Sequence, residues 1–388
     1  MRGMTNPMKM RGKGTIVRVA VVMPNHAELN SSLNNYVKTL HYIAKKGWAD
    51  ITLFTDEKNA LSLEGITVKK IRGFDYKTPL ERLLLVLGLP RHYYFNLEDH
   101  LKGHDTIVAN NPEFYAYACQ SYKIAKKHNK KFILRTSQTL DGFFLYKITK
   151  YLINPIVKKA YGYASYNIFA NPEAKQRCVR LGLLAKGGRT IITGHATDTE
   201  CFRPLSIRKP RNRVILSVGG LLKLKGHGYI IEALKMLHDG GYKDVELWIV
   251  GEGHYEDKLR SLAQDIGVDE SVKFLGAKSH NELAKIYNQA DVFVLANEQE
   301  ITPAVNEALA CGVPVVVMEC GGCGFVIRDG KEGLIARRNN PEDLAAKVKM
   351  LLERESYGKR MASNGKERVK RMFSIPVVAR KVAAAFAK

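Results

Sequence analysis

Residues 291–324 restrict the fold of this chain more than any other segment. Two short apolar runs, residues 291–296 and 313–318, lie on either side of a polar loop and a capped segment. Thr302 followed by Pro303 matches an N-cap with proline at the first helical position, which predicts a helix that ends at the glycine before the second run. Strand, helix and strand in this order form a βαβ unit, so we expect a parallel sheet.

The same segment carries residue types that suit a phosphate-bearing ligand. The N-terminus of the helix in a βαβ unit points free N–H groups at the carboxyl ends of the strands. Gly321 and Gly322 add close backbone amides, and the carboxylates of Glu300 and Glu307 can hold sugar or ribose hydroxyls. On these features alone, a nucleotide-type ligand and a purely structural βαβ unit remain equally open.

Strands and helices alternate through the whole chain in two series, which predicts doubly wound α/β domains. The first series has strands at 15–23, 51–55, 68–72, 106–109, 132–136 and 166–170, and helices at 33–46, 114–128 and 172–183. A polar, proline-bearing linker follows. The second series has strands at 214–218, 246–250, 272–275, 291–295 and 313–317, and helices at 227–239, 254–265, 279–289, 341–372 and 374–386. A length of 388 residues also favours two domains.

The net charge of +23 is distributed unevenly. Residues 1–200 hold 31 basic and 15 acidic side chains, residues 201–350 hold 20 of each, and residues 351–388 hold 10 basic and 3 acidic. A charge that served only solubility would be spread evenly along the chain. The uneven distribution favours a surface that contacts anionic lipid or a polyanion. We expect no nucleic-acid partner, because no nucleic-acid motif appears.

The cysteines and the absence of a long apolar run favour a cytoplasmic, reduced protein that does not span a membrane. There are six cysteines, no signal-peptide pattern and no apolar run of spanning length. Cys320 and Cys323 form a single CxxC. A structural zinc site needs about four ligands, and no second CxxC or paired histidine lies nearby, so we expect no metal and no cofactor.

Four segments resemble a known family. VGGLLKLKGH, WIVGEGHYEDKL, VKFLG and NEALACGVPVVV, followed by the glycine pair, occur in this order between residues 217 and 334. They are similar to the donor half of family 4 retaining glycosyltransferases. The resemblance implies the α/β GT-B fold, in which two Rossmann-like doubly wound domains face a cleft and a C-terminal helix crosses back to the first domain. The implied parts are a flexible basic tail (1–14), an acceptor-binding domain (15–205), a nucleotide-sugar donor-binding domain (206–370) and the returning helix (371–388).

The family places an Arg and a Lys of the first segment on the donor diphosphate. Lys225 occupies the Lys position, with Lys223 close enough in sequence to assist, whereas the Arg position is Gly220, next to Gly219. The resemblance implies that Lys225 balances the charge that develops on the leaving nucleotide diphosphate. A solvated loop lysine is the structural alternative.

The family also has two glutamates, one near the sugar and one on the ribose. Glu307 matches the second. The first role falls either to Gln299, eight places back, or to Glu300, seven places back; we favour Glu300 as a catalytic residue with Lys225, and a solvated loop acid is the alternative. The implied donor-binding set is completed by Thr302, Pro303, Ala304, Gly321 and Gly322, and by Phe274 and Leu275 beside the nucleobase.

The acceptor half departs from the family pattern. The family's glycine pair after the first strand corresponds to Ser31 and Ser32, and its cleft histidine falls on Gln138. These changes keep a catalytically silent nucleotide-sugar-binding protein open as an alternative. A sugar-nucleotide epimerase of the same architecture is a weaker hypothesis, because such enzymes lack a basic, aromatic acceptor lobe.

Two segments are candidates for contact with lipid. Residues 142–166 interleave aromatic residues with lysines, as interfacial segments do, and residues 78–90 are apolar. A core helix whose lysines extend to water is the alternative for residues 142–166. The resemblance and the charge together predict a retaining, metal-independent transfer from a nucleotide-sugar donor to a lipid-linked or membrane-proximal acceptor, by a peripheral protein on the cytoplasmic membrane face.

Overall fold

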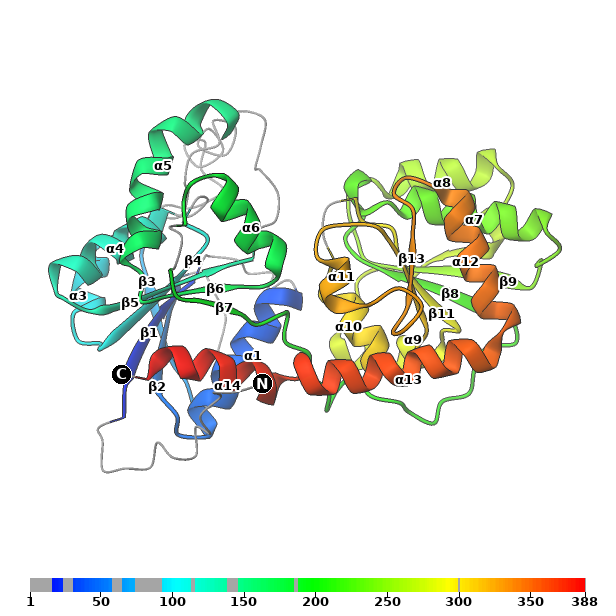
Figure 1. Ribbon diagram of the computed structural model, residues 1–388. Coiled ribbons are helices and arrows are strands. Elements are labelled where there is room, and N and C mark those ends of the chain that lie inside the picture. The colour runs from blue at the N-terminus through cyan, green and yellow to red at the C-terminus, as the bar shows by residue number, and fades with distance from the viewer. Residues whose placement is uncertain are drawn as a thin grey trace. The chain divides into compact units, whose positions relative to one another are not determined.

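The computed structural model describes residues 16–23, 31–57, 65–73, 93–112, 116–137, 146–184, 188–298 and 301–387, with the backbone alone for residues 31–34 and 146–154. The chain divides into two compact units (Figure 1). The first unit comprises Met1–Gly194 together with Ile375–Lys388, and the second comprises His195–Ser374. Each unit is a parallel sheet with helices packed on it, which confirms the predicted α/β class.

The first unit contains a seven-stranded parallel sheet with the order β3-β2-β1-β4-β5-β6-β7. Its strands are β1 (Arg18–Val22), β2 (Asp50–Asp56), β3 (Thr67–Ile71), β4 (Thr106–Asn110), β5 (Lys131–Thr136), β6 (Tyr166–Phe169) and β7 (Thr190–Ile192). The central strands are almost continuously buried, as expected when helices cover both faces of a parallel sheet. The strand order reverses between β1 and β4, and ligands of open α/β sheets bind at the carboxyl ends of such strands.

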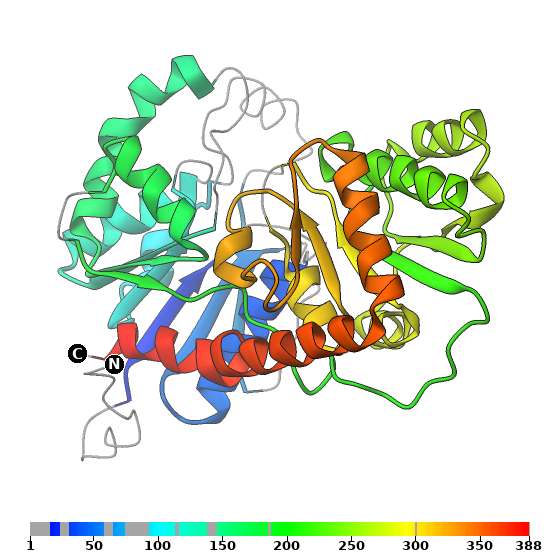
Figure 2. The same ribbon diagram turned by 45° about the vertical axis from the view of Figure 1, so that its right-hand side comes forward.

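The helices of the first unit include one from the far end of the sequence. They are α1 (Ser31–Lys45), α3 (Leu97–Leu101), α4 (Ala116–Lys127), α5 (Tyr146–Tyr163), α6 (Pro172–Arg180) and α14 (Ile375–Phe386). Helix α14 packs against α1, and the two lie side by side in Figures 1 and 2. Val378, Val382 and Phe386 recur at helical spacing on α14 and are buried, so this helix contributes apolar surface to the first unit.

The second unit contains a six-stranded parallel sheet with the order β10-β9-β8-β11-β12-β13. Its strands are β8 (Arg213–Val218), β9 (Val245–Val250), β10 (Val272–Phe274), β11 (Val292–Leu295), β12 (Val315–Met318) and β13 (Leu334–Ala336). Its helices are α7 (His227–Asp239), α8 (Glu256–Asp265), α9 (His280–Gln289), α10 (Pro303–Ala310), α11 (Cys323–Val326), α12 (Pro341–Glu353) and α13 (Glu355–Met372), with short 3₁₀ turns η2 (Lys223–Lys225) and η3 (Asp269–Ser271). The order reverses between β8 and β11.

The structure differs from the sequence prediction at several boundaries. The units divide at residue 194 rather than 205, because residues 195–205 pack on the second unit: Phe202 is fully buried in its core, and the Leu205 N–H donates to Asn288 Oδ1 at 2.7 Å. Helices were expected through residues 341–372, and the structure has two there, which Arg354 separates with φ −109° and ψ 67°. The short strands β7 and β13 were not predicted, since three residues are too few to show a pattern.

The second half of α5 packs as a core helix, which was the alternative given for residues 142–166 to an interfacial segment. Val157, Ala160 and Tyr161 are buried in the core of the first unit, and the Tyr161 hydroxyl lies 2.7 Å from Thr136 Oγ1. The expectation that aromatic rings of this segment insert into lipid is therefore wrong for Tyr161. Lys158 and Lys159 are exposed on the same helix. Residues 78–90 lie outside the described residues, and within the described part no helix is both long and apolar enough to cross a bilayer.

Candidate functional site

The predicted donor residues of the second unit collect where the sheet order reverses. The loop after β8 begins at Gly219, and the loop after β11 leads to the start of α10. Both loops leave the carboxyl ends of adjacent strands, as the register between β8 and β11 shows. This edge is the crevice in which doubly wound sheets bind ligands.

Glycines allow the loops after β8 and β9 to touch. The Gly219 N–H donates to the Val250 carbonyl at 2.9 Å. Gly251 has φ 142°, and a Cβ there would lie 2.0 Å from the Gly219 carbonyl oxygen, so no other residue fits. A Cβ at Gly253 would lie 2.3 Å from the carbonyl oxygen of Leu221. The VGEG motif therefore fixes the backbone of the loop that carries Gly219 and Gly220.

Lys225 lies in the 3₁₀ turn that continues this loop. The turn ends at Gly226, which has φ 69° and approaches the end of β11 so closely that a Cβ would lie 2.0 Å from the Ala296 carbonyl oxygen. The Glu298 N–H donates to the Leu224 carbonyl at 3.1 Å. The half-buried Lys225 is thus held beside the chain that runs from β11 to α10.

The start of α10 is arranged as the sequence predicted. Thr302 is the N-cap and Pro303 the first helical residue, but the Thr302 side chain makes no capping hydrogen bond, and its buried hydroxyl has no partner among the residues that the structure describes. The Ile301 N–H donates to the Gly321 carbonyl at 2.8 Å, which places the glycine pair next to the helix N-terminus. A helix start with an uncommitted N-cap hydroxyl and neighbouring glycine amides suits an anionic group.

Glu307 lies inside α10 and is 1% exposed. Its Oε2 accepts a hydrogen bond from the Tyr287 hydroxyl at 3.1 Å. Burial and the nearby Glu307 carboxylate raise the pKa of Tyr287, so this phenol stays a neutral donor. The hydroxyl of Tyr287, which lies on α9, therefore fixes the orientation of the Glu307 carboxylate.

The structure separates the two residues predicted to lie beside the nucleobase. Phe274 is on β10, the edge strand, and the Arg260 guanidinium of α8 lies 4.2 Å from its ring centroid. Phe274 packs with the core on the α7 and α8 side, whereas Leu275 packs with the cluster that contains α9 and α10 residues. One face of the Phe274 ring is therefore occupied by Arg260.

Sequence reasoning missed His227, the first residue of α7. This side chain is 3% exposed, and its Nδ1 lies 3.2 Å from Ser217 Oγ on β8. Burial lowers the pKa of His227 to about 4, so the ring is neutral near pH 7. The His227 ring packs against the loop at Gly219, where an added Cβ would lie 3.8 Å from Nε2. The only sequence feature that points to this residue is its position directly after Lys225 and Gly226.

Other predicted residues lie outside this arrangement. Gln299, Glu300 and Gln138 are outside the described residues, and for Ser31 and Ser32 the structure gives only their place in the first turn of α1. Cys320 and Cys323 are buried thiols. Within the described ranges, no group of three or more His, Cys, Asp and Glu side chains could hold a metal ion.

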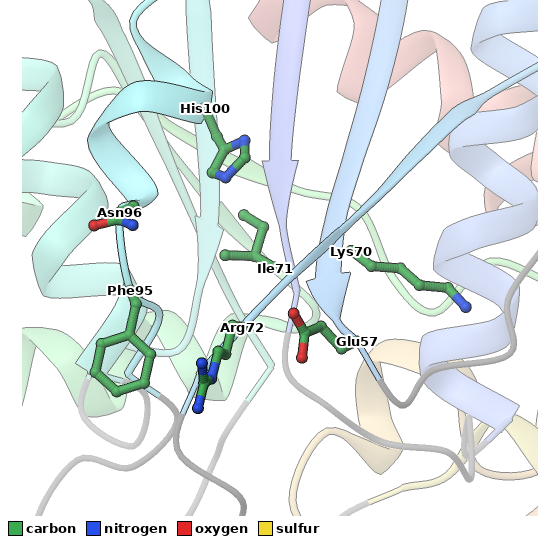
Figure 3. Close-up of a pocket in the computed structure, with 7 residues that line it drawn as sticks. All are labelled: Glu57, Lys70, Ile71, Arg72, Phe95, Asn96 and His100. Carbon is green, nitrogen blue, oxygen red and sulfur yellow. The ribbon is translucent and has the colours of Figure 1, made fainter.

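Two pockets lie away from the predicted donor residues. A cavity of about 560 Å³ in the first unit lies beside β2, β3 and α3 (Figure 3), and in it the side chain of Lys70 points away from Phe95 and Asn96. Its other lining residues are Glu57, Ile71, Arg72 and His100. A second cavity of about 490 Å³ in the second unit is bordered by Arg328 and Glu332, which form an ion pair.

Comparison with known proteins identifies the second unit. Residues 200–368 match the family model described as glycosyl transferases group 1. The chain carries a group 1 glycosyl transferase domain. An uncharacterized glycosyltransferase of Methanocaldococcus jannaschii is 31% identical over 153 residues, which cover 39% of this chain and 42% of that protein.

A second relative is a named sugar transferase. The N,N'-diacetylbacillosaminyl-diphospho-undecaprenol alpha-1,3-N-acetylgalactosaminyltransferase of Campylobacter jejuni is 26% identical over 238 residues, which cover 58% of this chain and 61% of that protein. The chain spans about half the length of the curated relatives it matches.

Solved structures agree on the fold of both units. The Anabaena HepE protein, crystallised in complex with UDP and glucose, matches with a TM-score of 0.74 and 14% identity over 95% of this chain and 98% of that chain. At this identity the match establishes the fold alone. The fold of this chain is GT-B, as the sequence resemblance implied.

Proposed function

We propose that this chain is a retaining glycosyltransferase that takes a sugar from a nucleotide-sugar donor and needs no metal ion. The observation that carries the proposal is the convergence, at the carboxyl edge of β8 and β11, of the Lys225 turn, the α10 N-terminus and the Gly321-Gly322 amides. These groups supply a positive charge and N–H donors to a diphosphate, whose charge grows as the sugar leaves. Group 1 membership of residues 200–368 and the UDP complex of HepE support this use.

In this proposal the carboxylates act on hydroxyl groups. Glu307, oriented by Tyr287, binds the ribose, and Glu300 orients the transferred sugar. Lys225 stabilises the leaving diphosphate, because its charge matters most when the glycosidic bond breaks. Lys225 and the N-terminus of α10 supply the electrostatic stabilisation of the leaving diphosphate, so no step of the proposed transfer requires a metal.

We also propose a lipid-linked or membrane-proximal acceptor that the first unit binds. This unit holds 34 basic and 13 acidic residues, whereas the second holds 27 and 25. A charge excess confined to one unit suits an anionic surface or acceptor. The name of the Campylobacter relative, which includes a diphospho-undecaprenol, supports the same class of acceptor.

A panel of uridine, guanosine and adenosine diphosphate sugars tests the donor half of the proposal. We expect sugar release or transfer from one of them, unchanged by EDTA, with the anomeric configuration of the donor kept in the product, as NMR would show. Lys225→Ala should lower turnover more than donor affinity, whereas Lys258→Ala, which changes an exposed lysine of α8, should alter neither.

Glu307→Gln tests the ribose role without opening a cavity. Loss of a charged hydrogen-bond acceptor should weaken nucleoside diphosphate binding by about 1 to 3 kcal/mol, measured by calorimetry. Nucleotide binding without any release or transfer would favour the alternative, a catalytically silent nucleotide-sugar-binding protein. Four departures from the family pattern motivate this alternative: Gly220, Gln299, Gln138 and the pair Ser31-Ser32.

A further inference from the structure

Four buried polar side chains of α1, β4 and β5 lack polar partners among the described residues. Asn35 and Tyr36 belong to α1, Asn110 ends β4, and Arg135 lies on β5; they are 1%, 3%, 2% and 7% exposed. Within the described part of the chain, both polar atoms of each asparagine and the Tyr36 hydroxyl make no hydrogen bond. No carboxylate of the described ranges forms an ion pair with Arg135, and its guanidinium carbon lies 4.3 Å from the centroid of the Tyr36 ring.

Three of these side chains, those of Tyr36, Asn110 and Arg135, belong to one place in the fold. Asn110 and Arg135 are register partners on adjacent parallel strands, so their side chains leave the same face of the sheet. β4 ends at Asn110 and β5 ends one residue after Arg135. Beyond them, hydrogen bonds join the two strand ends: the Ser137 N–H donates to Asn111 Oδ1 at 3.0 Å, and Asn111 Nδ2 donates to Ser137 Oγ at 3.3 Å. Since this adjoining pair is hydrogen-bonded in both directions, the missing partners of Asn110 and Arg135 do not reflect loose packing of the whole edge.

A buried guanidinium without an anion is costly and therefore informative. Arginine stays protonated, and the ring face of Tyr36 satisfies its charge only in part and none of its N–H donors. Burial lowers the pKa of Arg135 but leaves it a cation, and burial raises the pKa of Tyr36 to about 12, so the phenol remains an O–H donor. Arg135, Tyr36 and Asn110 thus present a positive charge, a hydroxyl and an amide to one ligand.

We propose that Arg135, Tyr36 and Asn110 bind a phosphate group of the acceptor. The inference rests on the function proposed above and names the chemistry by which the first unit recognises its substrate. A phosphate fits better than a carboxylate, because its three or more oxygens can occupy the guanidinium fork, the hydroxyl and an amide at once. The position agrees with the rule for open α/β sheets, since Asn110 ends β4, which borders the reversal of strand order.

Thermal unfolding with inorganic phosphate, at constant ionic strength and with saturating UDP, tests the site. GDP or ADP replaces UDP where the donor panel selects that base. The saturating nucleoside diphosphate is expected to fill the nucleotide site proposed in the second unit, so the remaining response reports the first unit. We expect a saturable rise in Tm with phosphate and little with acetate. Arg135→Met should abolish the rise and leave the Tm without phosphate unchanged or higher, because it removes an unpaired buried charge.

Arg189→Met is the matched control. Its guanidinium also lies over a tyrosine ring in the first unit, at 5.8 Å from the Tyr166 centroid, but Arg189 is exposed. This variant should keep the phosphate response. Should Arg135→Met fail to fold, Tyr36→Phe removes the hydroxyl alone and should raise the half-saturating phosphate concentration at least about 5-fold.

The proposal is overturned if the parent protein shows no saturable phosphate response, or if Arg135→Met or Tyr36→Phe responds as the parent does. The absence of any response to UDP, GDP and ADP, with an intact phosphate response, would instead contradict the donor proposal alone. Glycerol 3-phosphate and dihexanoyl phosphatidic acid then separate the sources of the phosphate: tighter binding of the lipid assigns a lipid-borne acceptor, and equal binding a water-soluble one. Either assignment holds only if Arg135→Met abolishes the rise in Tm with the ligand concerned.

Discussion

At the scale of single residues, His227 makes stability depend on pH. Its pKa is about 4 in the folded chain, against about 6.5 in an unfolded one, because burial disfavours the imidazolium. Above pH 6.5 the ring is neutral in both states and has no effect. As the pH falls from 6.5 towards 4, the unfolded chain binds a proton that the folded chain does not, so the free energy of unfolding decreases.

We predict that this histidine removes about 2 kcal/mol of stability between pH 7 and pH 5. Urea unfolding of the parent and of His227→Gln at both pH values measures the effect, because the glutamine variant should lose less stability over that interval. His254→Gln, which changes an exposed histidine in the loop after β9, should behave as the parent. An equal loss of stability in His227→Gln and the parent would contradict the assignment.

Residue roles were only partly predictable from the sequence. The N-cap at Thr302 followed by Pro303 was predicted and is confirmed, since cap preferences are local. The burial of Glu307 against Tyr287 and the support of Gly219 by His227 depend on packing between elements distant in sequence, which no local pattern contains. The roles in donor binding remain predictions.

At the scale of elements, one glycine determines how the Lys225 turn meets β11. Gly226 has φ 69°, and a side chain at this position would bring its Cβ to 2.0 Å from the Ala296 carbonyl oxygen. Gly267, after α8, has the same φ of 69°, but a Cβ there would meet no atom of the described residues within 4 Å. Comparing Gly226 with Gly267 therefore separates two free-energy costs of an added side chain: the cost of a left-handed backbone, and the cost of the steric clash with Ala296.

We predict that Gly267→Ala lowers the free energy of unfolding by about 1 kcal/mol, whereas Gly226→Ala lowers it by at least about 3 kcal/mol and also weakens nucleoside diphosphate binding. Denaturant unfolding and calorimetry measure the two effects. Equal destabilisation by both substitutions would show that the turn can move away from β11, and the placement of Lys225 described above would then be wrong.

Most elements could be predicted because periodic burial decides them. The buried strands of both sheets are apolar runs of the predicted kind, and α9 shows a full capping box at Ser279 and Glu282. The position of the break between α12 and α13, at Arg354, was not predicted, since both helices are amphipathic and no proline or glycine marks the junction. Short edge strands such as β7 were missed because they form only by pairing with a neighbour.

At the scale of the whole molecule, charge separates the two units. The basic excess lies in the first unit, and Lys158 and Lys159 project from α5 into solvent while the other face of that helix is core. Each basic residue near an anionic bilayer contributes about 1 kcal/mol, and salt screens the attraction over roughly 10 Å. Binding should therefore be electrostatic and reversible, with no contribution from the buried Tyr161 ring.

We predict that the protein sediments with anionic vesicles at low salt, is released as salt is added, and does not bind neutral vesicles comparably. A fourfold charge reversal on α5 should abolish sedimentation and leave UDP binding unchanged; the substitutions are Lys147→Glu, Lys150→Glu, Lys158→Glu and Lys159→Glu. The control makes the same change in net charge on the second unit, with Lys243→Glu, Lys258→Glu, Lys278→Glu and Lys285→Glu. Loss of sedimentation in both variants would attribute binding to net charge instead of to α5.

The place of α14 in the first unit has a consequence for biosynthesis. A ribosome translates the second unit, residues 195–374, after residues 1–194 and before residues 375–388. The surface of α1 that α14 covers therefore stays open while the second unit is being translated. The nascent first unit keeps this apolar face uncovered until α14 leaves the exit tunnel, so chaperone binding during synthesis should concentrate there.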